Sequence, residues 1–161
     1  MSHYDSATYS AHDSIGYLMR RGASLLREQL EDSFESAGIS FVQWATLMLV
    51  RDKPEITPGD LCRDLRHDSG ALTRILDHLE ERGLLHRARS GADRRSVQLR
   101  LTDGGQRMVE TRLPLVVDRL NDVLADFSPA EVTLLTSLLS RMILRLERTD
   151  AAPVAATRVR S

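Results

Sequence analysis

The fold is decided by residues 68–102, which read DSGALTRILDHLEERGLLHRARSGADRRSVQLRLT. Apolar residues at the start of this stretch recur at i, i+3, i+4 and i+7, which predicts a helix with one buried stripe. The stripe consists of Leu72, Ile75, Leu76 and Leu79, and the opposite face carries Ser69, Thr73, Arg74, Asp77 and His78. Asp68 is the expected N-cap of this helix, and Gly83 is expected to end it.

The second half of the stretch predicts a β-hairpin. Apolar residues at 97, 99 and 101 alternate with Gln98 and Arg100, which is the period of a half-buried strand. Its expected partner is residues 84–89. Between the two lies a loop at 90–95, SGADRR, in which a glycine permits a tight reversal and the arginines project into solvent.

A second short helix is expected just before this stretch, over residues 56–66. Thr57 is its predicted N-cap and Pro58 its first helical residue. Its inward face consists of Leu61, Cys62 and Leu65. Helix, tight turn, helix and hairpin together predict a winged helix-turn-helix, whose second helix presents short polar side chains and an arginine of the kind that read bases in the major groove. The alternative for the arginines is an ordinary solvated surface.

Long helices are predicted on both sides of this module. An apolar stripe runs from Ile15 to Phe34 and ends before Gly38, and Ser40 with Gln43 forms a capping box that opens a helix over 41–51. The residues expected to face inward from that helix are Val42, Trp44, Leu47, Met48 and Val50.

After the hairpin, Thr102 or Asp103 is expected to open a helix that reaches about Phe127 and bends at Pro114. Residues 128–131, SPAE, form another capping box before the last helix. That helix carries an apolar stripe too wide for one small domain to cover, made of Val132, Leu134, Leu135, Leu138, Leu139, Met142, Ile143 and Leu146.

The predicted fold class is therefore mainly α with a small β-hairpin wing, a winged helix-turn-helix flanked by long dimerisation helices. The dimerisation region is expected at 13–36 and 103–148, the DNA-binding domain at 40–102, and flexible tails at 1–12 and 149–161. Broad apolar faces on the terminal helices predict a homodimer, and the alternative is a helical core folded within one chain.

The segments LEERGLL (79–85), DRRSV (93–97) and LRLTDGG (99–105) resemble the MarR family of bacterial transcription regulators. The resemblance extends over about residues 13–148. It implies that Asp93 orients Arg95, which enters the minor groove, and that Arg94 contacts phosphate. It also implies a dimer and a small, often aromatic or phenolic, acid bound where the dimerising helices meet the winged domain.

Candidate site residues follow from the helix face and from this resemblance. The expected DNA-binding residues are Ser69, Ala71, Thr73, Arg74, His78, Asp93, Arg94 and Arg95, and a two-fold dimer would read an inverted repeat with recognition helices about 34 Å apart. The candidate effector-binding residues are Tyr17, Arg21 and Trp44, a phenol, a cation for a carboxylate and an aromatic wall. The alternative is that Trp44 belongs to the core and Arg21 is a surface charge.

Composition restricts the remaining classes of function. The formal net charge is −1, yet residues 57–101 hold nine arginines against five aspartates and two glutamates, so the winged module is locally basic. The sequence offers no phosphate loop, dinucleotide fingerprint or nucleophile elbow. No cofactor or metal is expected, and the single cysteine, Cys62, is expected to be a buried core residue.

The chain shows no long apolar run and no secretory leader, so we expect a cytoplasmic protein without a membrane partner. The sequence as a whole predicts a dimeric transcriptional repressor that responds to a small ligand and is not an enzyme. The alternative is a winged-helix adaptor that binds protein without specific DNA binding. A small helical enzyme would need a polar pocket with shifted ionisable groups, for which the sequence offers no obvious set.

Overall fold

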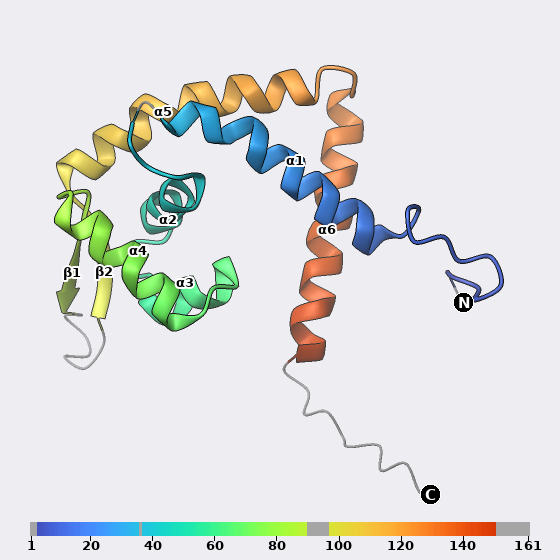
Figure 1. The fold of residues 1–161 in the computed structure, drawn as a ribbon, viewed down its shortest axis with the longest axis horizontal. Helices are drawn as coiled ribbons and strands as arrows, with labels where there is room; N and C mark the ends of the chain where they lie inside the picture. The colour runs from blue at the N-terminus through green and yellow to red at the C-terminus, as the bar shows by residue number, and fades with distance from the viewer. Residues whose placement is uncertain (1–2, 36, 90–96, 151–161) are drawn as a thin grey trace, which may run out of the picture. The chain divides into compact units, whose positions relative to one another are not determined.

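The computed structural model describes residues 3–35, 37–89 and 97–150. This part of the chain forms six helices and one two-stranded antiparallel hairpin (Figure 1). The elements are α1 Ile15–Glu35, α2 Phe41–Asp52, α3 Pro58–Leu65, α4 Ser69–Glu81, β1 Leu85–Arg89, β2 Val97–Leu101, α5 Asp103–Val123 and α6 Pro129–Asp150. The chain divides into two compact units, residues 1–119 and 120–161. The mainly helical fold with a hairpin agrees with the prediction.

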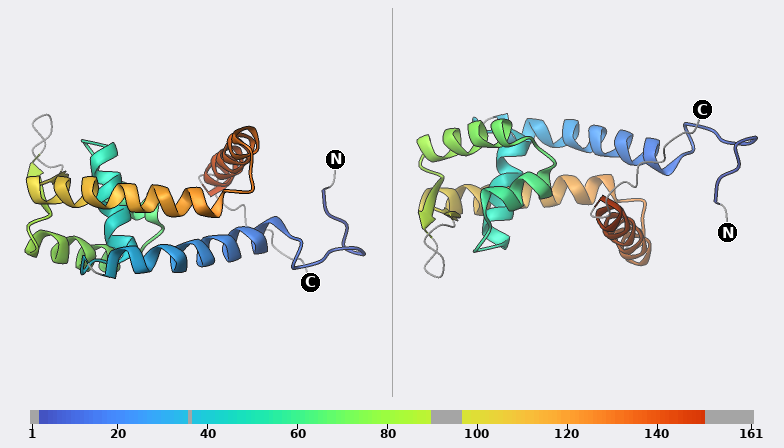
Figure 2. Two further views of the ribbon diagram at one scale, coloured as in Figure 1. Left: turned by 90° about the horizontal axis from the view of Figure 1, so that it is seen from above. Right: turned by 90° about the horizontal axis from the view of Figure 1, so that it is seen from below.

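The core of the first unit is built around α2, which contacts α1, α3 and β2. Two further contacts, of α3 with α4 and of α4 with β1, extend the core to the winged module. Views from above and below show α4 and the hairpin at the same end of this unit (Figure 2). The fully buried large side chains come from every one of these elements and include Phe34, Leu47, Leu61, Leu72, Leu76, Leu79, Leu85 and Leu99.

The predicted capping boxes are present. The Ser40 hydroxyl accepts from the Gln43 amide at 3.3 Å, and the Gln43 side chain accepts from the Ser40 amide at 2.9 Å. Thr57 caps α3 in the same way with a partner not expected from the sequence, Asp60, whose carboxylate accepts from the Thr57 amide at 2.9 Å. These hydrogen bonds fix where each helix begins, because they satisfy amides that have no partner within the helix.

Gly83 ends α4 as predicted, with a φ of +64°. The amide of Leu84 donates to the carbonyl of Leu79 at 2.9 Å, the long-range bond of a glycine-terminated helix. The chain then enters β1 directly. The start of α5 passes so close to this turn that a Cβ built on Gly105 would lie 1.9 Å from the carbonyl oxygen of Leu84. The first turn of α5 is therefore packed on the backbone that joins the recognition helix to the wing.

The prediction of a simple half-buried β2 was partly wrong. Val97 is 39% exposed, whereas Gln98 is only 8% exposed and Leu99 is fully buried. The amide of Leu99 donates to the carbonyl of Ile56 at 3.0 Å, and β2 contacts both α2 and α3. Because β2 has packing partners besides β1, alternation of side chains alone does not decide which of them are buried.

The inward faces of the first helices differ in detail from those expected. In α1, Leu30 and Phe34 are buried, but Ile15, Leu18 and Leu25 are about half exposed. In α2, the expected residues Trp44, Leu47 and Val50 are buried, whereas Val42 and Met48 are only partly buried. Thr46 is also fully buried, and its hydroxyl is satisfied there because it donates to a backbone carbonyl one turn earlier. Cys62 is partly and not fully buried, which corrects that expectation.

The later helices follow the predicted order. α5 runs through Pro114 and ends at Val123, four residues before the expected end, in a turn closed by the Phe127 amide on the Leu124 carbonyl. Ser128 and Glu131 form the predicted capping box of α6. None of the described side chains of α6 is fully buried, and its large apolar residues Leu134, Leu135, Leu138, Ile143, Leu144 and Leu146 are all more than 40% exposed.

Candidate nucleic-acid interface

The interface begins at the N-terminus of α4. The carboxylate of Asp68 accepts from the amide of Ala71 at 2.8 Å, as the sequence predicted. This backbone hydrogen bond lowers the pKa of Asp68 below its ordinary value, with a smaller contribution from the charge of Arg74. The turn before it is made by Arg66, which adopts a left-handed conformation with φ +52°. Together they set where the first turn of α4, the part that enters a groove in helix-turn-helix proteins, begins.

The polar face of α4 is exposed. Ser69, Thr73, Arg74 and His78 all lie on the solvent side, while Leu72, Leu76 and Leu79 are buried beneath them. Ala71 is only partly exposed. The hydroxyl of Thr73 donates to the carbonyl of Ser69 at 2.7 Å, so its oxygen is free to accept but its proton is already used. The structure therefore brings four of the expected helix residues onto one accessible face.

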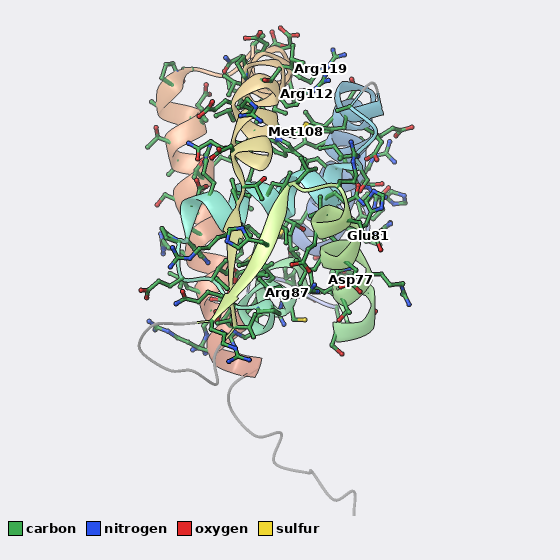
Figure 3. All side chains as sticks on the ribbon, turned by 90° about the vertical axis from the view of Figure 1, so that its left-hand side faces the viewer. Asp77, Glu81, Arg87, Met108, Arg112 and Arg119 are labelled. Atoms are coloured by element: carbon green, nitrogen blue, oxygen red, sulfur yellow. The ribbon has the colours of Figure 1, made fainter. Side chains whose placement is uncertain are left out.

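Asp77 belongs to the same polar face but is not free. Its carboxylate binds the guanidinium of Arg87 on β1 at 2.7 Å, and Figure 3 shows the two side chains close together between helix and strand. Glu80 pairs with the other terminal nitrogen of Arg87 and also accepts from the Arg87 amide at 3.1 Å. This cluster was not predicted from the sequence, although one signal was available. Arg87 is two residues from Leu85 on a strand, so both side chains point to the same face.

The C-terminal end of α4 carries a second arginine contact that was not predicted. The guanidinium of Arg82 donates to the carbonyl of Gly38 and, at 3.0 Å, to that of Ala37. These carbonyls belong to the turn after α1. Arg82 lies more than 40 positions from Ala37 and Gly38 in the chain. Periodicity and local motifs therefore give no signal of this contact.

The wing residues Asp93, Arg94 and Arg95 lie outside the described residues. The described strands lead toward them in a fixed register that pairs Leu85 with Leu101 and Arg89 with Val97.

The three candidate effector-binding residues do not come together within one chain. The rings of Trp44 and Phe34 pack at 5.1 Å, but Tyr17 is seventeen residues before Phe34 on the same helix, about 25 Å away at the rise of an α-helix. Tyr17 packs instead against His12, with ring centroids 5.0 Å apart, and Arg21 is exposed. A pocket of about 570 Å³ between α1 and the start of α2 is lined by other residues, Ser24, Arg27, Glu28, Glu31, Ser40 and Val42.

Trp44 is buried, which fits the core alternative, but it also has an unusual feature. Its indole nitrogen is buried and has no hydrogen-bond partner among the described residues. A buried donor without an acceptor is costly and rare in folded proteins.

Two other kinds of site are absent from the described residues. These residues contain no group of three or more His, Cys, Asp or Glu side chains that could hold a metal ion. Within the same residues, no helix combines the length and apolar character needed to span a membrane.

Comparison with known proteins agrees with this geometry. The model of the MarR family matches residues 37–96. An uncharacterized HTH-type transcriptional regulator from Bacillus subtilis, YdgJ, is 33% identical over 114 residues, which span 71% of this chain and 70% of the relative. The HTH-type transcriptional regulator PecS from Dickeya dadantii is 31% identical over 127 residues, covering 77% of this chain and 76% of PecS.

A solved structure extends the likeness to the fold. A mutant of MarR from E. coli, complexed with operator DNA, is 29% identical and superposes with a TM-score of 0.70 over 83% of this chain and 99% of that one. YdgJ and PecS are both named as HTH-type transcriptional regulators. With a winged helix-turn-helix, an exposed polar recognition helix and relatives that match over more than two thirds of its length, the chain belongs to the MarR family of DNA-binding transcription regulators.

Proposed function

We propose that this protein is a homodimeric repressor that binds an inverted-repeat operator and is released from it by a small aromatic acid. The single observation that carries the DNA-binding part is the exposed polar face of α4, held in place by the Asp68 cap. The operator complex of the E. coli MarR mutant supports duplex DNA as the partner.

Each exposed residue of α4 has a distinct role in this proposal. Arg74 donates to a guanine through its planar fork, Ser69 accepts from or donates to a base edge, Thr73 accepts from one, and His78 contacts phosphate. Asp93 orients Arg95 for the minor groove and Arg94 contacts phosphate, as the resemblance to the MarR family implies. The positive N-terminal end of α4 adds favourable electrostatics near the phosphate backbone.

The dimer is supported by apolar surface that the single chain leaves open. Large apolar side chains are exposed along the length of α6 and at the beginning of α1. Many exposed large apolar side chains on one helix, as on α6, are typical of protein interfaces. A two-fold dimer would place two copies of α4 about one DNA turn, 34 Å, apart.

Of the three candidate effector-binding residues, Trp44 is the one that binds the acid in this proposal. Tyr17 and Arg21 do not contribute to the same site, because they lie far from Trp44 in one chain. The buried indole N–H without an acceptor supports this choice, since an oxygen of a carboxylate or phenol would satisfy it. An effector that binds more tightly to the dimer with one spacing of the two α4 helices would shift the equilibrium away from the spacing that binds DNA.

Fluorescence anisotropy tests the DNA-binding part. We would titrate the protein into the duplex upstream of its own gene and into a scrambled duplex, each at two salt concentrations. We expect preference for the native duplex and a steep loss of affinity with salt. Arg74→Ala should lower the affinity by about 1 to 3 kcal/mol, and Arg95→Ala by a similar amount, whereas Arg107→Ala, at an exposed arginine on α5, serves as the matched control. Binding to neither duplex would favour the protein-binding adaptor.

Intrinsic tryptophan fluorescence can report effector binding near Trp44, because Trp44 is the only tryptophan of the chain. Titration with salicylate and with p-hydroxybenzoate should change the intrinsic fluorescence and, at the same concentrations, release the labelled duplex. A change in fluorescence without release of DNA would contradict the proposed link between the two sites.

A further inference from the structure

We propose that Arg87 is a positioning residue that locks the hairpin onto the recognition helix, so that helix and wing meet DNA as one rigid unit. This inference rests on the proposed function, because it assumes that both elements contact the same duplex. It assigns to Arg87 a role in specificity that does not require Arg87 to touch DNA.

The geometry of the cluster is that of a clamp, which we name the Arg87 clamp and define as Arg87, Asp77 and Glu80. Asp77 and Glu80 are one turn apart on α4 and bind the two terminal nitrogens of the Arg87 guanidinium. Glu80 also accepts from the Arg87 backbone amide at 3.1 Å, so both the side chain and the main chain of β1 are tied to the helix. A planar guanidinium suits such two-sided binding far better than an ammonium.

The clamp lies where the hairpin needs support. α4 ends at Glu81 and β1 begins at Leu85, and the short connection between them includes Gly83 in a left-handed conformation. The apolar contacts of Leu85 hold the base of the hairpin. Arg87 pairs with Leu99 in the middle of the described ladder, two residues from Leu85, and the pairs Ala88 with Gln98 and Arg89 with Val97 lie beyond it. Fixing this step fixes the direction in which the strands leave the helix.

The charges of the clamp argue against Arg87 as a simple phosphate contact. Its two carboxylate partners more than neutralise it, and the side chain of Arg87 is only 31% exposed. Burial alone would lower the pKa of Arg87, but the hydrogen bonds and charges of Asp77 and Glu80 raise it above its ordinary value. Arg87 in turn neutralises Asp77, a half-exposed carboxylate on the DNA-facing side of α4 that would otherwise repel phosphate.

The decisive experiment removes the clamp without changing its net charge. In the double variant Arg87→Met with Asp77→Asn, one positive and one negative charge disappear together. We expect its preference for the native over the scrambled duplex to fall about tenfold, the size of a typical coupling within one hydrogen-bonded network. Its affinity for the scrambled duplex and the slope of log affinity against log salt should stay unchanged, because the number of phosphate contacts is the same.

The matched control is Arg51→Met with Asp52→Asn, which removes an exposed ion pair of 2.8 Å on α2 with the same change of charge. It should leave both affinities unchanged. An equal loss of affinity for both duplexes, or a salt slope lower by about one contact, would identify Arg87 as a phosphate contact and overturn the inference.

A second variant keeps the test valid if the double variant does not fold. Arg87→Lys retains the charge but cannot bind both carboxylates through a planar fork, so we expect an intermediate loss of preference for the native duplex. An unchanged preference in a folded Arg87→Lys protein would overturn the inference. Failure of the wild-type protein to bind either duplex would instead overturn the proposed function.

Discussion

Arg82, at the C-terminal end of the recognition helix, donates to the backbone carbonyl of Gly38 in the turn after α1. The same guanidinium reaches the carbonyl of Ala37 at 3.0 Å. One side chain therefore connects the helix expected to read DNA with the end of a helix expected to form the dimer. Any movement of the turn after α1 would therefore pull directly on the C-terminal end of α4.

Replacing Arg82 by methionine should destabilise the fold by about 1 kcal/mol, because charged hydrogen bonds to carbonyls are lost at a partly solvated site. Chemical denaturation followed by circular dichroism measures this. Arg63→Met is the control, since Arg63 is 75% exposed and its ion pair with Asp60 should contribute little. Equal stabilities of the two variants would mean that the Arg82 contact is not significant in solution.

Gly105→Ala should be strongly destabilising, because its Cβ would lie 1.9 Å from the carbonyl oxygen of Leu84. The backbone of α5 would have to move away from the turn before β1, at a cost of about 1 to 3 kcal/mol or more. Gly59→Ala is the matched control. Its Cβ would meet only a side-chain oxygen at 3.7 Å, so it should stabilise α3 by about 0.5 to 1 kcal/mol. Thermal unfolding of both variants distinguishes these outcomes, and a Gly105→Ala protein as stable as wild type would contradict the close approach.

Lysine at both Leu134 and Leu138 should convert the proposed dimer to monomers. These side chains are 59% and 47% exposed and lie one turn apart on α6, and burying two charges in an interface without partners is unfavourable. Light scattering coupled to size-exclusion chromatography gives the mass directly. Lysine at Ser137 and Ser140, both exposed on α6, adds the same charge outside the apolar stripe and should leave the dimer intact. Monomeric wild-type protein would contradict the proposed assembly.

Acid should destabilise the fold through its helix caps. Hydrogen bonds to the amide of Ala71 and to Thr57 lower the pKa of Asp68 and Asp60, respectively, below the ordinary 3.8. A lowered pKa in the folded state means stabilisation that is complete above pH 3.8 and disappears as the pH falls through the folded-state values. Melting curves should show a melting temperature that falls between pH 7 and pH 2.5. The fall should be smaller in Asp68→Asn, because asparagine caps a helix without a charge. A melting temperature that rises in this range would contradict the assignment.

The sequence was sufficient to predict features that depend on neighbouring residues. Ser40, Thr57, Asp68 and Ser128 begin their helices as expected, and Gly83 ends α4, because capping and left-handed glycine are local effects. The buried stripe of α4 was also predicted, since Leu72, Leu76 and Leu79 recur at the spacing of one helix face.

Features that depend on distant partners were not predictable in this way. Gln98 is buried in a strand that packs against both α2 and α3, and Trp44 is distant from Tyr17 because seventeen residues of α1 separate Tyr17 from Phe34, which packs on Trp44. The roles of Arg82 and Arg87 were not predicted, because their partners lie on other elements of the fold.

The hairpin register has one more consequence, which concerns the edges of the two strands. In the pair formed by Arg87 and Leu99, the amide of Arg87 donates to the Glu80 carboxylate and that of Leu99 to the Ile56 carbonyl. In each strand, the central backbone amide that points away from the other strand thus already donates a hydrogen bond within the chain. A two-stranded sheet would otherwise invite pairing with strands of other molecules. The two described strands are in this way protected against edge-to-edge aggregation.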